Sequence, residues 1–278
     1  MKLSQFLKTA NIIQQRESLS HWWSKGIFIT IAASIFISSF FLNNRIRYTE
    51  TNVVSVEIQP LLLPILIGVI VIALYLSAML VVNIAREREK GTLEILLIGP
   101  VNERVYLAGM FYAYFKLFAI AISVFFAWTL ASIFILNMPF KLEIAGIFMA
   151  SILFAAEMNA LGSLIVSIGK KPRHALIAFI LVLLFLGAVH LTDELVSQYA
   201  LSTSAVVTDP LIVIRNILMK TNQVFSAVSP FAHYYRGVQE LLNGNLAGTI
   251  WKFVQMSGQA VVLLAAGTIV LRKNRGRE

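Results

Sequence analysis

The side chain best suited to chemistry in this sequence is a carboxylate inside an apolar run. Glu157, followed by Asn159, lies near the middle of residues 142–168. A carboxylate within a membrane is costly unless it is paired, protonated or facing water. Three interpretations stay open: Glu157 lines a substrate path, it bonds a neighbouring helix, or it lies shallower than these boundaries suggest.

The motifs of several enzyme classes are missing from the sequence. It has no H-E-x-x-H zinc motif, no D-D-x-x-D cluster, no G-x-S-x-G elbow and no cysteine. It also lacks a G-x-x-x-x-G-K-[ST] phosphate loop, so we expect neither ATP hydrolysis nor a bound cofactor in this chain. The histidines lie far apart in sequence, and no two share a helix face: His21, His174, His190 and His233. An intramembrane enzyme is therefore disfavoured.

The second candidate site is the polar segment 86–100, which separates two long apolar runs. It reads R-E-R-E-K-G-T-L-E-I-L-L-I-G-P and opens with five consecutive charges. Gly91 should break any helix that arrives from upstream. Thr92 can cap a new short helix, and Glu94 would lie in its first turn, where a carboxylate suits the positive end of the helix dipole.

The predicted short helix is amphipathic. Leu93, Leu96 and Leu97 are spaced i, i+3 and i+4, which places them on one face. Gly99 and Pro100 should end the helix. The segment 86–100 therefore predicts a short helix that lies across the mouth of a membrane span, with its orientation set at both ends.

The composition identifies a polytopic membrane protein. The chain has 278 residues, of which 58% are hydrophobic and 13% charged, whereas soluble domains are about 25% charged. Several apolar runs approach the ~20 residues needed to cross a bilayer. The net charge of +9 could indicate nucleic acid binding, but the placement of the basic residues favours membrane topology, so no nucleic acid partner is expected.

The apolar runs predict an all-α fold in a single transmembrane domain, 1–278. An interfacial helix is expected over 1–25, followed by a first span that acts as an uncleaved signal-anchor. Over 192–248 we expect an external segment with short helices at the outer leaflet, or one that is partly re-entrant where protein buries it. Lysine and arginine are concentrated before the first span, in 86–104, in 170–173 and after the last span, which predicts that both termini are cytoplasmic. Six spans are expected, at 26–42, 61–85, 105–136, 142–168, 174–191 and 249–271.

The segment 86–100 resembles the signature of the membrane subunits of type-2 ABC exporters, E-x-G-T-L-E-x-L-L followed by proline. The matching residues are Glu89, Gly91, Thr92, Leu93, Glu94, Leu96, Leu97 and Pro100. In that family the segment is the coupling element that docks on a separate ATPase subunit, and we assign the same role to Glu87. The leucine face would then fill a groove on the ATPase, while Glu89 and Glu94 would pair with basic residues at its rim.

A second stretch extends the resemblance. Ser229, Pro230, His233, Gly237 and Val238 match a pattern of the branch that contains gliding-motility, sodium-efflux and copper-processing permeases. Many relatives carry phenylalanine near this histidine, whereas here Tyr234 and Tyr235 follow it.

The resemblance implies a set of partners and a location. It implies two copies of an ABC ATPase that bind ATP and Mg²⁺, a second copy of this permease or a homologous one, and a bacterial inner membrane. Substrate movement would be driven by the ATPase. The alternative is an ATPase-coupled membrane scaffold or mechanotransducer that moves no solute.

Overall fold

The computed structural model describes residues 3–22, 24–52, 60–98, 101–138, 140–169, 171–202, 220–221 and 224–275. Within these ranges the chain is helical and contains no strand. The helices are α1 (Leu3–Trp22), α2 (Lys25–Asn52), α3 (Leu62–Glu89), α4 (Thr92–Ile98), α5 (Glu103–Ile135), α6 (Leu142–Ile168), α7 (Pro172–Ser202), α9 (Pro230–Leu242) and α10 (Leu246–Arg275). The predicted all-α fold is confirmed.

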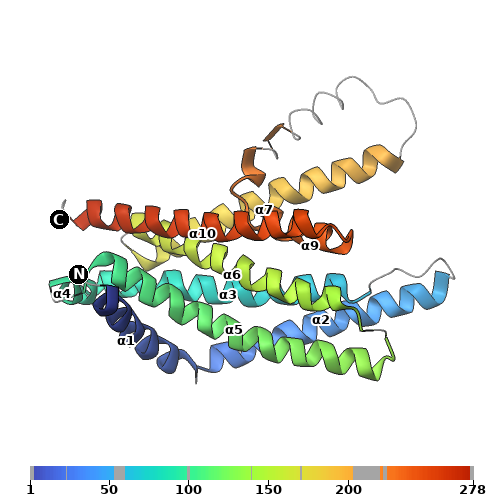
Figure 1. Ribbon diagram of the computed structural model, residues 1–278, viewed down its shortest axis with the longest axis horizontal. Helices are drawn as coiled ribbons and strands as arrows, with labels where there is room; N and C mark the ends of the chain where they lie inside the picture. The colour runs from blue at the N-terminus through green and yellow to red at the C-terminus, as the bar shows by residue number, and fades with distance from the viewer. Residues whose placement is uncertain are drawn as a thin grey trace.

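Six of these helices are long and apolar enough to cross a membrane: α2, α3, α5, α6, α7 and α10. They run roughly side by side along the length of the molecule (Figure 1). The predicted polytopic architecture with six spans is therefore confirmed. The short helix α4 and both ends of the chain lie at the same end of this bundle, which is called the α4 end below (Figure 1).

Several helices continue beyond the apolar runs that predict them. The first span is predicted to end at residue 42, but α2 continues to Asn52, and α7 continues to Ser202 rather than ending at 191. Polar side chains end a hydrophobic run without ending a helix, because the backbone hydrogen bonds do not depend on them. Of the predicted external segment 192–248, residues 203–219 and 222–223 lie outside the described part of the chain.

α9 lies within the predicted external segment and is partly buried by other helices, as the re-entrant alternative expects. His233 and Tyr234 are only 5% and 2% exposed, and α9 packs against α6 and α10. α6 is the most buried of the six apolar helices. Its glycines allow close packing, since a Cβ at Gly146 would lie 2.5 Å from the side chain of Leu241.

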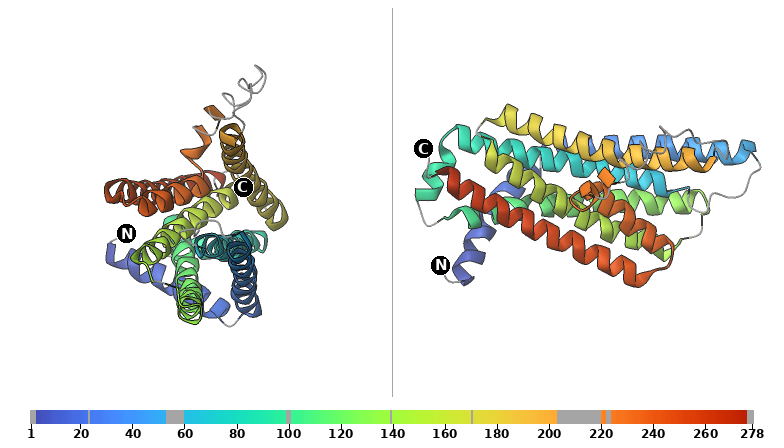
Figure 2. Two further views of the ribbon diagram at one scale, coloured as in Figure 1. Left: turned by 90° about the vertical axis from the view of Figure 1, so that its right-hand side faces the viewer. Right: turned by 90° about the horizontal axis from the view of Figure 1, so that it is seen from above.

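α1 crosses the α4 end of the bundle instead of following its axis (Figure 2). It packs mainly on α5, and the helices meet at Gly109, where a Cβ would lie 2.8 Å from the side chain of Ile13. Residues 1–2 and 23, which belong to the predicted interfacial helix, lie outside the described part. At the α4 end, α1 therefore covers α5, and α4 lies against α3.

Candidate functional site

The turn between α3 and α4 has the glycine break that the sequence predicts. α3 ends at Glu89, and Gly91 adopts φ = +69°, a conformation that costs other L-residues energy. Its amide donates to the Arg88 carbonyl at 3.1 Å, and the Lys90 amide donates to the Arg86 carbonyl at 3.0 Å. The end of α3 and the direction of α4 are set together by this one residue.

Thr92 does not play the role expected of it. Its hydroxyl donates a 2.9 Å hydrogen bond back to the carbonyl of Glu87 in α3. A donor of this kind satisfies a carbonyl at the end of α3, whereas a cap of α4 would have to accept from an amide. Thr92 therefore ties α4 to α3. Pro100, which is expected to end α4, lies outside the described residues.

The leucine face of α4 points into the protein rather than away from it. Leu93 is 2% exposed and Leu97 7% exposed, both within the hydrophobic core, and Leu96 is partly buried against that core. The expectation that these leucines fill a groove on the ATPase is therefore wrong. A helix of seven residues needs such contacts, because a helix this short is not stable alone.

The exposed side chains of α4 and of the end of α3 form a different face. Ile95 is 69% exposed, and Glu89, Thr92 and Glu94 are exposed beside it. This face, Glu89, Thr92, Glu94 and Ile95, is called the α4 face below. It combines two carboxylates with one large apolar side chain. The spacing of apolar residues in the sequence does not single out Ile95 as the exposed one.

Glu87 belongs to an internal network instead of the α4 face. Its Oε1 accepts from Arg16 Nη2 of α1 at 2.7 Å, and its Oε2 accepts from the Tyr106 hydroxyl of α5 at 2.5 Å. One carboxylate therefore joins α1, α3 and α5 at the α4 end.

Around Glu87 the network continues along α1. Arg16 Nε also donates to Glu17 Oε1 at 3.0 Å, and His21 Nε2 lies 3.6 Å from Glu17 Oε2. Burial opposes ionisation of the Glu17 carboxyl, but His21 and Arg16 together lower the pKa of Glu17 below its ordinary value. Burial likewise opposes the charge on Arg16, yet Glu87 and Glu17 raise the pKa of Arg16.

A third set of contacts holds the end of α1 against α3 and α5. The amide nitrogen of Asn83 lies 2.5 Å from His21 Nε2 and donates to the Tyr114 hydroxyl. The sequence places these residues in separate elements and does not pair them. The available signal is the presence of Asn83 and Tyr114 within otherwise apolar helices, where polar groups need partners.

Arg88 shows that the charged run before Gly91 is not uniformly solvated. Its side chain is buried, and Nη1 donates to the carbonyls of Gly169 at 3.0 Å and Ser167 at 3.3 Å. Asn274 of α10 donates to the same Ser167 carbonyl at 3.0 Å. A cation at the C-terminal end of α6 is favourable, because the helix dipole is negative there. Arg88 thus fixes the base of the α3–α4 turn to α6 and α10.

The second candidate site lies deep in the bundle, where Glu157 of α6 meets His233 of α9. Glu157 is fully buried, and its Oε1 lies 2.9 Å from His233 Nδ1. His233 is placed by the start of α9, where Ser229 accepts from the Ala232 amide at 3.4 Å and Pro230 occupies the first turn. This contact is a bond between helices, as the second interpretation of Glu157 expects.

Other polar side chains of α6 also form hydrogen bonds to neighbouring helices. The Ser77 hydroxyl of α3 donates to Asn159 Oδ1 at 2.9 Å, and the hydroxyls of Ser151 and Tyr234 lie 2.8 Å apart. Within the described part of the chain, Glu157 Oε2 and Asn159 Nδ2 have no hydrogen-bond partner. The two stretches that carry the resemblance lie apart: the α3–α4 turn is at the α4 end, and α9 lies toward the other end of the bundle (Figure 1).

Comparison with known proteins identifies the family. A family model described as ABC-2 family transporter protein matches residues 4–275. No curated protein matches the chain. Because the family match covers nearly the whole chain and six of its helices can span a membrane, the protein belongs to the ABC-2 family of transporter proteins and is a multi-pass membrane subunit of an ABC transporter.

Proposed function

We propose that this subunit is part of an exporter and that the α4 face docks on a separate ABC ATPase. The observation that carries the proposal is the construction of the α3–α4 turn. Buried leucines, a positive-φ glycine and the Thr92–Glu87 hydrogen bond hold α4 rigidly, while Glu89, Glu94 and Ile95 stay exposed at its surface. A rigid helix with an open acidic and apolar face is suited to transmit force from a partner.

Movement applied to α4 would reach most of the bundle. α3 continues from the turn as one helix of 28 residues, which is roughly 42 Å long. Glu87 connects the end of α3 to α1 and α5, and Arg88 connects it to the C-terminal end of α6. A displacement of α4 therefore cannot be absorbed within the turn and is passed to the packed helices.

The assembly that follows has two permease and two ATPase subunits. Membrane subunits of this family pair with an ABC ATPase, which would bind ATP and Mg²⁺ here. The second permease would be another copy of this chain or a homologous one. In this proposal the α4 end and both termini face the cytoplasm of a bacterial cell, and the substrate path lies between the two permeases.

The test is a charge reversal on the α4 face, in this chain co-expressed with its ATPase. Glu94→Lys should cost only ~0.3–1 kcal/mol locally, through the helix dipole, so the protein should insert and keep its thermal stability. Charge reversal at an interface costs more, so ATPase binding should weaken about tenfold or more. Ile95→Asp should act similarly, because it removes the exposed apolar contact.

The matched control is Glu240→Lys, which makes the same charge change at the other end of the bundle, where Glu240 accepts from Asn245. It should leave ATPase binding intact. Full binding by both Glu94→Lys and Ile95→Asp would show that the α4 face is not the docking site. ATP-driven solute movement in liposomes would then separate an exporter from a scaffold or mechanotransducer, which would show none.

A further inference from the structure

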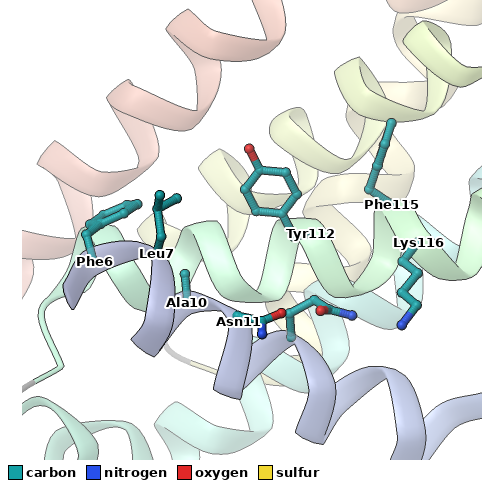
Figure 3. Close-up of a pocket in the computed structure, with 8 residues that line it drawn as sticks. Phe6, Leu7, Ala10, Asn11, Tyr112, Phe115 and Lys116 are labelled. Carbon is teal, nitrogen blue, oxygen red and sulfur yellow. The ribbon is translucent and has the colours of Figure 1, made fainter. Parts of the chain in front are cut away.

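A groove lies in the angle between α1 and α5 at the α4 end. It encloses about 360 Å³ and is open to the surroundings along one side. Figure 3 shows side chains of both helices along it. The lining residues are Phe6, Leu7, Ala10, Asn11, Gln14, Tyr112, Phe115 and Lys116.

The groove has two chemically different parts. Phe6, Leu7 and Phe115 give it apolar walls, whereas Asn11, Gln14 and Lys116 bring amide groups and one cation. Lys116 is exposed, and among the described residues its ammonium group has no hydrogen bond or ion pair. A cation without a partner beside apolar walls matches an amphiphile with a negative headgroup.

The level of the groove in the molecule points to lipid. α1 leads through a short connection into α2, which begins at Lys25 and is one of the candidate spans. α1 itself exposes Leu7, Ile12 and Leu19. A helix that crosses the bundle with large apolar side chains exposed, directly before a span, belongs at the membrane surface, where phospholipid headgroups lie.

We propose that this groove binds an anionic phospholipid. The phosphate pairs with the Lys116 ammonium group and accepts from the amides of Asn11 and Gln14. One acyl chain lies along Phe6, Leu7 and Phe115. The lipid would fill the angle between α1 and α5 and so support the position of α1, which also contacts α3 through Glu87 and Asn83.

Lipid retention by the full-length protein tests the proposal. The protein is equilibrated in detergent with phosphatidylglycerol or phosphatidylcholine, and bound lipid is counted by native mass spectrometry. The wild type should retain phosphatidylglycerol in preference to phosphatidylcholine. Lys116→Gln should weaken that retention about fivefold, the factor for ~1 kcal/mol from one lysine at an anionic lipid surface. The matched control Lys8→Gln, an exposed lysine of α1 outside the groove, should retain the lipid.

A second variant examines the apolar wall. Leu7→Asn should lower the retention of phosphatidylglycerol without changing thermal unfolding, because Leu7 is exposed. Equal retention by wild type and Lys116→Gln would overturn the proposal. Displacement of the lipid by excess inorganic phosphate would assign the site to free phosphate instead. A disulfide between two copies of Asn11→Cys, in a chain without native cysteine, would show that a second copy covers the groove.

Discussion

At the scale of single residues, the meaning of a buried polar side chain depends on its partner. Glu157 in an apolar run is compatible with a path, a helix bond or a shallow position, and the 2.9 Å contact with His233 supplies the helix bond. This buried polar pair is held in place by its hydrogen bond. Removing one member leaves the other without compensation in a poorly solvating environment, which is more destabilising than removing both.

The Glu157–His233 contact can be measured by a double-mutant cycle. Glu157→Leu and His233→Leu should each lower the free energy of unfolding by about 1–3 kcal/mol, because each leaves a buried polar partner without its hydrogen bond. The double variant should lose less than the sum, by about 0.5–3 kcal/mol. Thermal or denaturant unfolding in detergent measures these energies. Additive losses would mean that the contact contributes nothing.

Transport by Glu157→Gln at the wild-type rate would also exclude a role for the charge in binding a cationic substrate.

Glu17 predicts a pH dependence with a definite sign. Its pKa is lowered in the folded protein by His21 and Arg16, so the ionised form is bound more tightly than the protonated form. The resulting stability is fully present above the ordinary pKa of a glutamate, about 4.3, and is lost as pH falls through the lower folded value. In a thermal-unfolding series from neutral to acidic pH, the wild type should therefore lose more stability than Glu17→Gln. Parallel curves for the two proteins would contradict this assignment.

At the scale of elements, α4 shows how a short helix is oriented by its neighbours. Its leucine spacing correctly indicates an apolar face but cannot say what that face covers. In the structure Leu93 and Leu97 are buried in the protein's own core, and the exposed side carries Glu94 and Ile95. The direction of α4 depends on Gly91, whose positive φ an L-residue adopts only with strain.

Gly91→Ala tests the role of the α3–α4 turn separately from the stability of the fold, and the chain offers a matched control. Gly244, at the end of α9, has nearly the same φ, +71°, and a Cβ added there would have open space within 4 Å. Both substitutions should cost about 1–2 kcal/mol through the backbone, seen as similar decreases in melting temperature. Only Gly91→Ala should reduce ATP hydrolysis coupled to transport, because only it misdirects α4. If ATP hydrolysis stays equally coupled to transport in both variants, the turn does not take part in coupling.

At the scale of the whole molecule, the α4 end gathers the parts that the proposed function needs on one side of the membrane. α4, both ends of the chain and the contacts of Arg16, Glu87 and Arg88 are all located there (Figure 1). The short connection between α9 and α10 lies at the opposite end. The described parts of the basic segments 86–104 and 170–173, and the end of α10, lie at this same end (Figure 1).

The orientation can be measured directly, because the chain has no cysteine. Single cysteines at Lys171 and Lys273, both exposed at the α4 end, should react with an impermeant maleimide only after the cells are opened. A cysteine at Asn243, exposed in the connection between α9 and α10, should react in intact cells. Labelling of Lys171→Cys from outside would reverse the orientation and remove the α4 face from contact with a cytoplasmic ATPase.

Features that are local in the chain could be read from the amino-acid sequence alone. Six apolar runs of spanning length and the helix break at Gly91 are of this kind, because hydropathy, run length and glycine conformation do not depend on distant residues. The resemblance to ABC exporters likewise rests on a contiguous stretch, and the family match agrees with it at the level of the ABC-2 family.

Which side chain meets which became visible only in the folded bundle. Glu157 and His233 are 76 positions apart, Arg16 and Glu87 are 71 apart, and no helical period relates such pairs. The same holds for the inward leucines of α4 and for buried Arg88 in a run of charges. A helix has an apolar or polar face by its own spacing, but what that face contacts is set by the packing of the other helices, which is a property of the whole bundle.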